Sequence, residues 1–259
     1  MLLAIDAGNT NIVFAVYDGD AQRCVWRCKA DNGRTGDEYA AWLFPLFMQE
    51  KLEFAAITEA VICSVVPDAN FHLMNLCRSR FGCDPFMVSH ETVSLRISLD
   101  KPAEIGADRL VNALAVLHDY QSPAIVIDFG TATTFDVIND DDVYIGGVIA
   151  PGVNLSMEAL HKAAAKLPRI TIEKPSSVIG KDTISAMQSG VYWGYVGMIE
   201  GTLGRIMQEL GWCKPLVIAT GGLASLFADT ITDIDKVDKD LTLRGLVHIY
   251  QNRLKQKVI

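Results

Sequence analysis

The sequence predicts an α/β protein built from two similar domains. Apolar runs of strand length alternate with segments whose apolar residues recur at helical spacing, which is typical of sheets flanked by helices. The chain also carries an internal repeat. Residues 5–17 and 127–138 each read as an apolar strand, an Asp-x-Gly turn and a second strand. Chance similarity of two short segments is the alternative, but we favour a duplicated domain.

The expected elements after the first strand pair follow in chain order. Strands are expected where apolar runs end at turn residues, and helices where apolar residues recur every three or four positions, as at Leu110, Ala113, Leu114 and Leu117. With a boundary near 119–123, the domains are 1–120 and 121–259, with the alternative that the last helix packs back on the first domain. The expected elements are a strand at 61–65, helices at 70–80 and 107–120, strands at 124–127 and 143–150, helices at 155–165 and 184–210, a strand at 215–219, a short helix from 223 and a last helix at 241–254.

Composition and net charge disfavour some classes of function for this chain. Hydrophobic residues make up 50% of the chain and charged residues 21%, as in ordinary globular proteins. The net charge of −8 disfavours nucleic-acid binding as the main activity, because that activity needs basic surface to displace counterions. The six cysteines include no C-x-x-C pair, so we expect reduced, mostly buried thiols rather than disulfides or metal ligands.

The chain is expected to be soluble and cytoplasmic. Its first residues, Met-Leu-Leu-Ala-Ile-Asp, lack a basic region and read as a strand rather than a signal peptide. Residues 184–199 are apolar, but Gln188 interrupts them and Glu200 ends them. This segment falls short of a membrane span.

The first Asp-x-Gly turn, Asp6-Ala-Gly-Asn-Thr-Asn11, suits phosphate binding. Gly8 permits a tight turn, whose free N–H groups can hold phosphate oxygens. The carboxylate of Asp6 ends the strand, where it can organise the Mg²⁺ that accompanies a nucleotide. A plain hairpin turn is the alternative reading, since Asn and Gly favour turns in any case.

Two further loops also have residues that suit phosphate binding. Asp128-Phe-Gly-Thr-Ala-Thr-Thr134 again offers a strand-end carboxylate, turn amides and hydroxyls. Thr220-Gly-Gly222 lies at a strand-to-helix junction, where glycine lets a ligand approach the backbone. Together the loops favour a phosphate-handling site. The chain has no G-x-G-x-x-G, and 180–182 lacks the remaining residues of a P-loop, so neither of those nucleotide-binding motifs is present.

Gly106-Ala-Asp-Arg109 opens the predicted helix at 107–120. Free amides at a helix start attract anions. Asp108 can accept a hydroxyl proton during phosphoryl transfer, and Arg109 can hold a carboxylate or phosphate in a bidentate fork. A helix start with an acidic residue and a surface ion pair is the alternative.

Five glycines form one stripe along the predicted helix at 184–210. Each interior glycine costs about 0.5–1 kcal/mol relative to alanine, so a close helix–helix approach should offset the cost. That approach can lie within the chain or across a twofold axis, and we favour a homodimer. The stripe consists of Gly190, Gly194, Gly197, Gly201 and Gly204.

These motifs resemble those of the type III pantothenate kinases, within the superfamily of acetate and sugar kinases, heat-shock chaperones and actin. The resemblance runs nearly end to end and is carried by 6–10, 106–109, 128–132, 146–152 and 220–222. It implies two ribonuclease-H-like (actin-like ATPase) domains with a nucleotide cleft between them. It also implies ATP-dependent phosphorylation of the primary hydroxyl of pantothenate to 4′-phosphopantothenate, the first step of coenzyme A biosynthesis.

The same resemblance implies roles for individual residues. Asp108 is the catalytic base, and Gly106, Ala107, Asp108, Arg109 and Thr183 contact pantothenate, with Thr183 reaching the partner's site in a dimer. Mg²⁺ lies near Asp6, and Asp128 binds a monovalent cation, K⁺ or NH₄⁺. The residues implied in ATP binding are Asp6, Ala7, Gly8, Asn9, Thr10, Asn11, Ile12, Val13 and Thr131.

Two rival functions stay open at this point. A non-catalytic relative can bind nucleotide and act as a transcription-accessory protein, although Asp6, Asp108, Arg109 and Asp128 together favour catalysis. The second rival is a kinase for another hydroxylated acid. One departure from the family pattern is Leu99, where many relatives carry a substrate-contacting Tyr; its loss can change pantothenate affinity.

Overall fold

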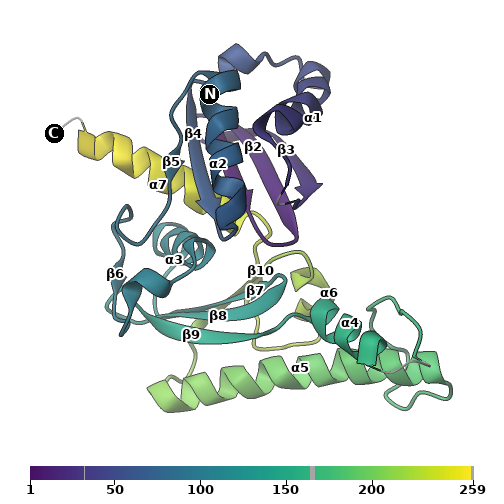
Figure 1. Cartoon of the computed structure of the whole chain (residues 1–259). Coiled ribbons are helices and arrows are strands. Elements are labelled where there is room, and N and C mark those ends of the chain that lie inside the picture. Colours follow the sequence, from purple (N-terminus) through teal and green to yellow (C-terminus); the bar gives the residue numbers. More distant parts are fainter. Residues whose placement is uncertain (32, 164–166, 258–259) are drawn as a thin grey trace. The chain divides into compact units, whose positions relative to one another are not determined.

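The computed structural model describes residues 1–31, 33–163 and 167–257 (Figure 1). The chain divides into two compact units, one formed by Met1–Tyr120 with Asp240–Ile259 and the other by Gln121–Lys239. The segment from 240 onward, which the sequence analysis assigned to the second domain, therefore packs with the first unit. In the described part of the chain, no helix is both long and apolar enough to cross a membrane.

The first unit has helices on both faces of a sheet whose strand order is β3-β2-β1-β4-β5. Alternate residues of β1 serve opposite faces. Leu3 and Ile5 pack with α1 and α2, whereas Leu2 and Ala4 pack with α3 and α7. Its elements are β1 (Leu2–Ala7), β2 (Asn11–Asp18), β3 (Ala21–Lys29), α1 (Gly36–Gln49), η1 (Phe54–Ala56), β4 (Glu59–Ser64), α2 (Pro67–Leu76), the π-helical turn η2 (Cys77–Phe81), β5 (Phe86–Met87), β6 (Arg96–Ile97), η3 (Pro102–Glu104), α3 (Ala107–Asp119) and α7 (Leu241–Lys257).

The second unit places the long helix α5 against its own sheet (Figure 1). Ile125, Ile127 and Phe129 of the first strand pack in one core with Tyr192 and Ile199 of α5. The elements of this unit are β7 (Ala124–Phe129), β8 (Ala132–Ile138), β9 (Val143–Pro151), α4 (Val153–Ala163), α5 (Thr183–Leu210), β10 (Leu216–Thr220), α6 (Ala224–Ala228) and β11 (Lys236–Val237).

The two units share one strand topology. In the first, β1 pairs antiparallel with β2, β2 pairs antiparallel with β3, and β1 and β4 extend the sheet in parallel toward β5. In the second, β7 pairs antiparallel with β8, β8 with β9, and β7 and β10 extend it in parallel toward β11. The predicted α/β class with two similar domains is confirmed.

Most expected elements are present with small shifts of their ends. The helix expected at 184–210 is α5, and the one expected at 241–254 is α7. Of the helix expected at 155–165, residues 164 and 165 lie outside the described residues. Helix α1 was not expected. It begins with a capping box in which Thr35 and Glu38 satisfy each other's backbone N–H groups.

Candidate active site

Asp6 lies near the carboxyl end of β1, in a row of side chains that crosses the first sheet. It stands opposite Val13 of β2 and Cys63 of β4, and Val13 stands opposite Arg27 of β3. Residues opposite one another on neighbouring strands share a face of the sheet. Asp6 therefore has Cys63 on one side and, beyond Val13, the cationic Arg27 on the other.

The turn after Asp6 presents backbone and polar side chains to solvent. The N–H of Gly8 donates to the carbonyl of Asn11 at 3.0 Å, and Asn9, Thr10 and Asn11 are exposed. The side chains of three other expected ATP contacts, Ala7, Ile12 and Val13, are buried in the core. Those three can therefore offer a ligand only their backbone groups.

Asp108 lies in the first turn of α3 and folds back onto its own backbone. Its Oδ1 accepts the N–H of Arg109 at 2.8 Å. A Cβ added to Gly106 would lie 2.5 Å from that same oxygen, so with any other residue at 106 the carboxylate would have to shift. Burial raises the pKa of Asp108, against the opposing effect of Arg109.

Asp6 and Asp108 interact electrostatically. Burial, and next the charge of Asp108, raise the pKa of Asp6 from 3.8 to about 7, while Arg27 and a hydrogen bond with Cys63 oppose the rise. A buried carboxyl whose ionisation a second carboxylate disfavours gains from a nearby positive charge. The donor set thus fits a hard divalent cation such as Mg²⁺, which prefers carboxylate oxygens.

The second unit gathers three loops around Asp128. Asp128 stands opposite Thr134 of β8 and Thr220 of β10, in a row that matches the one around Asp6. A Cβ on Gly221 would lie 2.5 Å from Asp128 Oδ1, and one on Gly152 would lie 2.7 Å from the carbonyl oxygen of Gly130. These glycines let the loop backbones approach one another closely around the carboxylate.

Thr131 and Thr183 lie at exposed positions of the second unit. Thr131 is in the turn after β7, where its carbonyl accepts the N–H of Gly152 at 3.1 Å. Thr183 is the first residue of α5, directly after its N-cap Asp182. It also lines an apolar cavity of about 800 Å³ beside α4 and α5, whose wall includes Val153 and Met187.

The family was decided by comparison with known sequences. Residues 2–205 match the family model described as type III pantothenate kinase. The chain belongs to the type III pantothenate kinase family. It is 57% identical over 253 residues to a type III pantothenate kinase of Paramagnetospirillum magneticum, covering 97% of both chains. It is 55% identical to that of Rhodospirillum rubrum, covering 97% of this chain and 98% of the relative.

Solved structures of low sequence identity to this chain share the fold. A Sinorhizobium meliloti protein assigned as a 2-dehydro-3-deoxygalactonokinase aligns with a TM-score of 0.62 at 14% identity, covering 97% of this chain and 96% of that one. A Campylobacter jejuni protein assigned to the Baf family of transcriptional activators aligns with a TM-score of 0.63 at 18% identity, covering 98% and 99%. These likenesses establish the actin-like fold alone.

The sequence analysis missed two neighbours of Asp6 in this pantothenate kinase. Arg27 and Cys63 both act on its pKa. Arg27 is in a strand whose pairing the analysis did not assign, and Cys63 was interpreted only as a core residue. The registers of β4 against β1 and of β3 against β2 place Cys63 next to Asp6 and Arg27 one strand further along the same row, but a single sequence does not specify strand register.

The raised pKa of Asp6 predicts a pH-dependent stability of the ligand-free kinase. A carboxyl whose pKa is raised by folding contributes stability that is fully present below its unfolded pKa and lost as pH rises through the folded value, here about 7. A rise from 3.8 to about 7 corresponds to about 4 kcal/mol for a dry carboxyl, and we expect about 1–2 kcal/mol because Asp6 is partly exposed.

Asp6→Asn should therefore gain about 1–2 kcal/mol of unfolding free energy relative to the parent between pH 5 and pH 8. Urea unfolding at the two pH values measures this, in buffer without divalent cations. Asp233→Asn, which removes an exposed carboxylate, is the control and should show no such change. The unfolding free energy of Asp6→Asn, relative to that of the parent, should be higher at pH 8 than at pH 5. The same difference at both pH values would contradict the interpretation.

Proposed function

We propose that this chain transfers the γ-phosphoryl group of ATP to the primary hydroxyl of pantothenate, giving 4′-phosphopantothenate for coenzyme A biosynthesis. The observation that carries the proposal is its identity of 50–57% to curated type III pantothenate kinases over nearly its whole length. The coupled carboxylates Asp6 and Asp108 are consistent with it. We further propose a cytoplasmic enzyme, with the two units as its actin-like domains.

In this proposal, the Gly106–Arg109 segment receives pantothenate. Arg109 binds the substrate carboxylate, because a guanidinium fork matches that group. Asp108 orients the primary hydroxyl and accepts its proton late, since the transition state for phosphoryl transfer is loose. The elevated pKa of Asp108 makes it a better proton acceptor than an ordinary aspartate. Thr183 is proposed as a further pantothenate contact.

The ATP phosphates are assigned to the turn at 6–13, with Thr131 as a further contact. Turn amides and the side chains of Asn9, Thr10 and Asn11 supply hydrogen-bond donors for phosphate oxygens. Asp6 would hold Mg²⁺, which when bound neutralises charge on the phosphates. Asp128 is assigned to a monovalent cation, K⁺ or NH₄⁺, because its carboxylate lies beside Thr134 and the close backbone at Gly221.

The transcription-accessory alternative is not favoured. The structure assigned to a transcriptional activator family shares only 18% identity with this chain, whereas the curated kinases share more than half of its residues. A likeness at the lower level speaks for the fold and not for the function.

An ATP-consumption assay on the purified chain tests the proposal. ADP production should depend on pantothenate and should be faster with K⁺ or NH₄⁺ than with Na⁺ at equal ionic strength. Other hydroxylated acids serve as the substrate control. Equal turnover with one of them would redirect the assignment to another kinase, and ATP binding without any turnover would favour a non-catalytic relative.

A homodimer through α5 is also proposed. A Cβ added to Gly190, Gly194, Gly197 or Gly204 would meet no atom within 4 Å, so these glycines are not needed for packing within the chain. On the helix they lie opposite the buried residues Tyr192, Ile199 and Leu203. A close approach by a second copy explains why this exposed stripe is glycine.

Gly194→Leu should convert the dimer to a monomer, because a leucine on the stripe holds the second helix away. Sedimentation velocity measures the change, and circular dichroism checks that the chain is folded. Glu209→Leu, an exposed position on α5 away from the stripe, should leave the dimer intact. An unchanged dimer in Gly194→Leu would remove α5 as the interface.

A further inference from the structure

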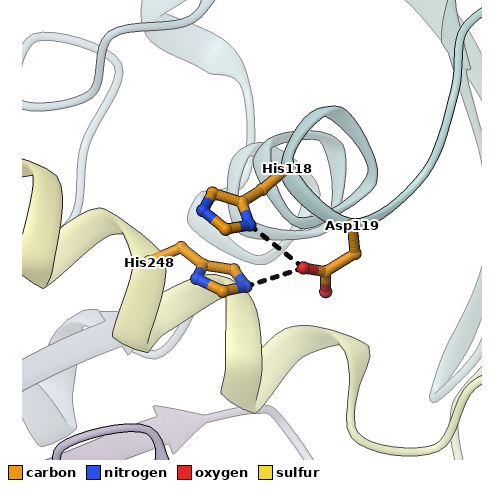
Figure 2. A group of neighbouring side chains, drawn as sticks. All are labelled: His118, Asp119 and His248. Atoms are coloured by element: carbon orange, nitrogen blue, oxygen red, sulfur yellow. Dashed lines mark hydrogen bonds and ion pairs between the residues drawn. The ribbon is translucent and has the colours of Figure 1, made fainter.

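Two histidines and an aspartate meet where α3 and α7 lie side by side (Figure 2). His118 and Asp119 end α3, and His248 comes from the second turn of α7. His118 Nδ1 lies 3.1 Å and His248 Nε2 lies 2.9 Å from the same oxygen, Asp119 Oδ1. The two imidazole rings stack, with centroids 3.6 Å apart and planes 15° from parallel.

The three potential ligand atoms, His118 Nδ1, His248 Nε2 and Asp119 Oδ1, are almost as far apart as the ligand atoms around a bound metal ion. They all lie within 4.8 Å of one another. A tetrahedral Zn²⁺ with bonds of about 2.0–2.1 Å sets its ligand atoms roughly 3.3–3.4 Å apart. The observed 2.9 and 3.1 Å to Asp119 Oδ1 thus need to open by a few tenths of an ångström. Binding therefore requires side-chain rotations that widen these distances and turn the two stacked rings toward one ion.

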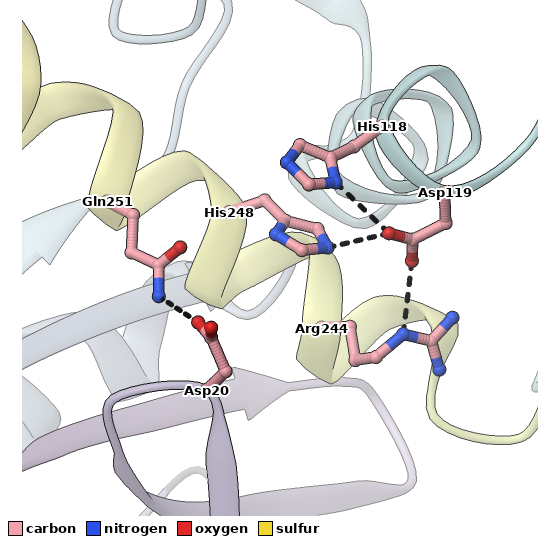
Figure 3. A network of polar contacts seen from close by, with 6 residues as sticks. All are labelled: Asp20, His118, Asp119, Arg244, His248 and Gln251. Carbon is pink, nitrogen blue, oxygen red and sulfur yellow. Dashed lines mark hydrogen bonds and ion pairs between the residues drawn. The ribbon is translucent and has the colours of Figure 1, made fainter.

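The surrounding contacts hold the cluster in place. Arg244 Nε donates to the other carboxylate oxygen, Asp119 Oδ2, at 3.0 Å, which leaves Oδ1 directed at the histidines (Figure 3). Metal-binding carboxylates are commonly oriented by such a second hydrogen bond. Three residues after His248, Gln251 Nε2 donates to Asp20 Oδ1 at 2.7 Å, so the helix is also tied to the β2–β3 turn (Figure 3).

The two helices that carry the cluster are packed tightly. A Cβ on Gly245 would lie 2.6 Å from the carbonyl oxygen of Val111 and 3.1 Å from the Cβ of Ala115, so the α7 backbone approaches α3 closely. The hydroxyl of Thr242 donates to the buried Asn112 at 2.7 Å. The ligand-bearing backbone is therefore fixed, which lowers the entropic cost of assembling a site.

We propose that His118, Asp119 and His248 form a binding site for a borderline divalent transition-metal ion, with Zn²⁺ as the best match. Two imidazoles and one carboxylate are a ligand set of zinc and similar ions, whereas Mg²⁺ and Ca²⁺ prefer oxygen ligands alone. The carboxyl end of α3 adds a negative dipole end that favours a cation.

Two features set the expected strength of binding. The positive charge of Arg244 lies next to the carboxylate, and His248 Nδ1 is buried without a hydrogen-bond partner among the described residues. A metal-bound histidine normally donates its second N–H, and loss of such a partner weakens binding by about 10–100-fold. We therefore expect micromolar rather than nanomolar affinity for Zn²⁺.

The position of the site suggests what the ion does. Asp119 lies just before the chain enters the second unit at Gln121, and α7 begins just after the chain leaves that unit at Lys239. An ion shared by α3 and α7 would brace the two chain segments that connect the units. This role does not depend on the proposed kinase activity.

Zinc titration of the full, metal-stripped chain tests the site. Calorimetry should show Zn²⁺ binding at one ion per chain, and Co²⁺ in its place should give the visible absorption of a tetrahedral complex. His118→Ala and Asp119→Asn should each weaken this binding at least about 10-fold. His72→Ala, which removes a histidine on α2, is the matched control and should bind as the parent does.

Hydrogen exchange supplies a second measurement that is independent of the variants' folding. Saturating Zn²⁺ should slow amide exchange at the end of α3 and the start of α7 in the parent. Binding in His118→Ala within about twofold of the parent, or unchanged exchange at 117–121 and 241–248 with Zn²⁺ bound, would overturn the proposal. No binding at 100 µM Zn²⁺ would overturn it as well.

Discussion

Asp108→Asn is expected to lower kcat about 100-fold or more, within the range attributed to a positioned general base. The amide has nearly the shape of the carboxylate but cannot take the proton of the attacking hydroxyl. The KM for ATP should change little, because the donors proposed to hold the phosphates are the amides and side chains of the turn at 6–13, and Asp108 is not one of them. Steady-state kinetics with both substrates measure the split between kcat and KM.

The control for Asp108→Asn is Asp100→Asn, which changes an exposed carboxylate in the segment before α3 and should leave kcat unchanged. A second readout follows from the charge that Asp108 exerts on Asp6. Removal of that charge should lower the pKa of Asp6, and the pH dependence of stability should move to lower pH. Near-normal turnover in Asp108→Asn would remove Asp108 from the role of base.

Gly221→Ala is expected to destabilise the second unit by about 2–4 kcal/mol, through strain and overpacking together. Gly221 has a φ of +89°, and its added Cβ would lie 2.5 Å from Asp128 Oδ1 and 2.7 Å from the backbone nitrogen of Phe129. The backbone of Phe129 cannot shift as easily as a flexible side chain can. The same displacement should move Asp128 and, if the proposed assignment of this residue to a monovalent cation holds, raise the K⁺ concentration that gives half-maximal activity.

The neighbouring glycine provides a matched control. A Cβ on Gly222 would meet no atom within 4 Å, and its φ is outside the left-handed region. Gly222→Ala should therefore change the unfolding free energy by less than about 0.5 kcal/mol. Urea unfolding of both variants, followed by circular dichroism, makes the comparison. Equal stability of the two variants would contradict the close packing of Gly221 against Asp128.

Much of the fold was predictable because local patterns determine it. The repeated strand–turn–strand segments predict two similar units. The equivalent antiparallel pairings of β1 with β2 and of β7 with β8 confirm that prediction. The spacing of its apolar residues predicts the helix α7 but not the unit against which it packs. The packing of α7 on α3 depends on a long-range contact, the close approach of Gly245 to Val111. A single glycine in the sequence does not reveal that contact.

The residues of the candidate site are proposed from sequence motifs, whereas the electrostatic effect of Asp108 on Asp6 is seen only in the structure. The turns at Asp6 and Asp128 are recognisable because each combines a strand-end carboxylate, a glycine and hydroxyl or amide side chains. The effect of Asp108 on the pKa of Asp6 depends on a fold-determined proximity across 102 positions of sequence. The cluster of His118, Asp119 and His248 was not predicted for the same reason, since its members come from two helices that are far apart in the sequence.

Transfer of a labelled γ-phosphate from ATP to pantothenate by the purified chain tests the central claim most directly. The account predicts labelled 4′-phosphopantothenate in equal amount to ADP, and no labelled product from an analogue whose primary hydroxyl is replaced by hydrogen. A folded chain that binds ATP yet transfers no label to pantothenate would contradict the assignment.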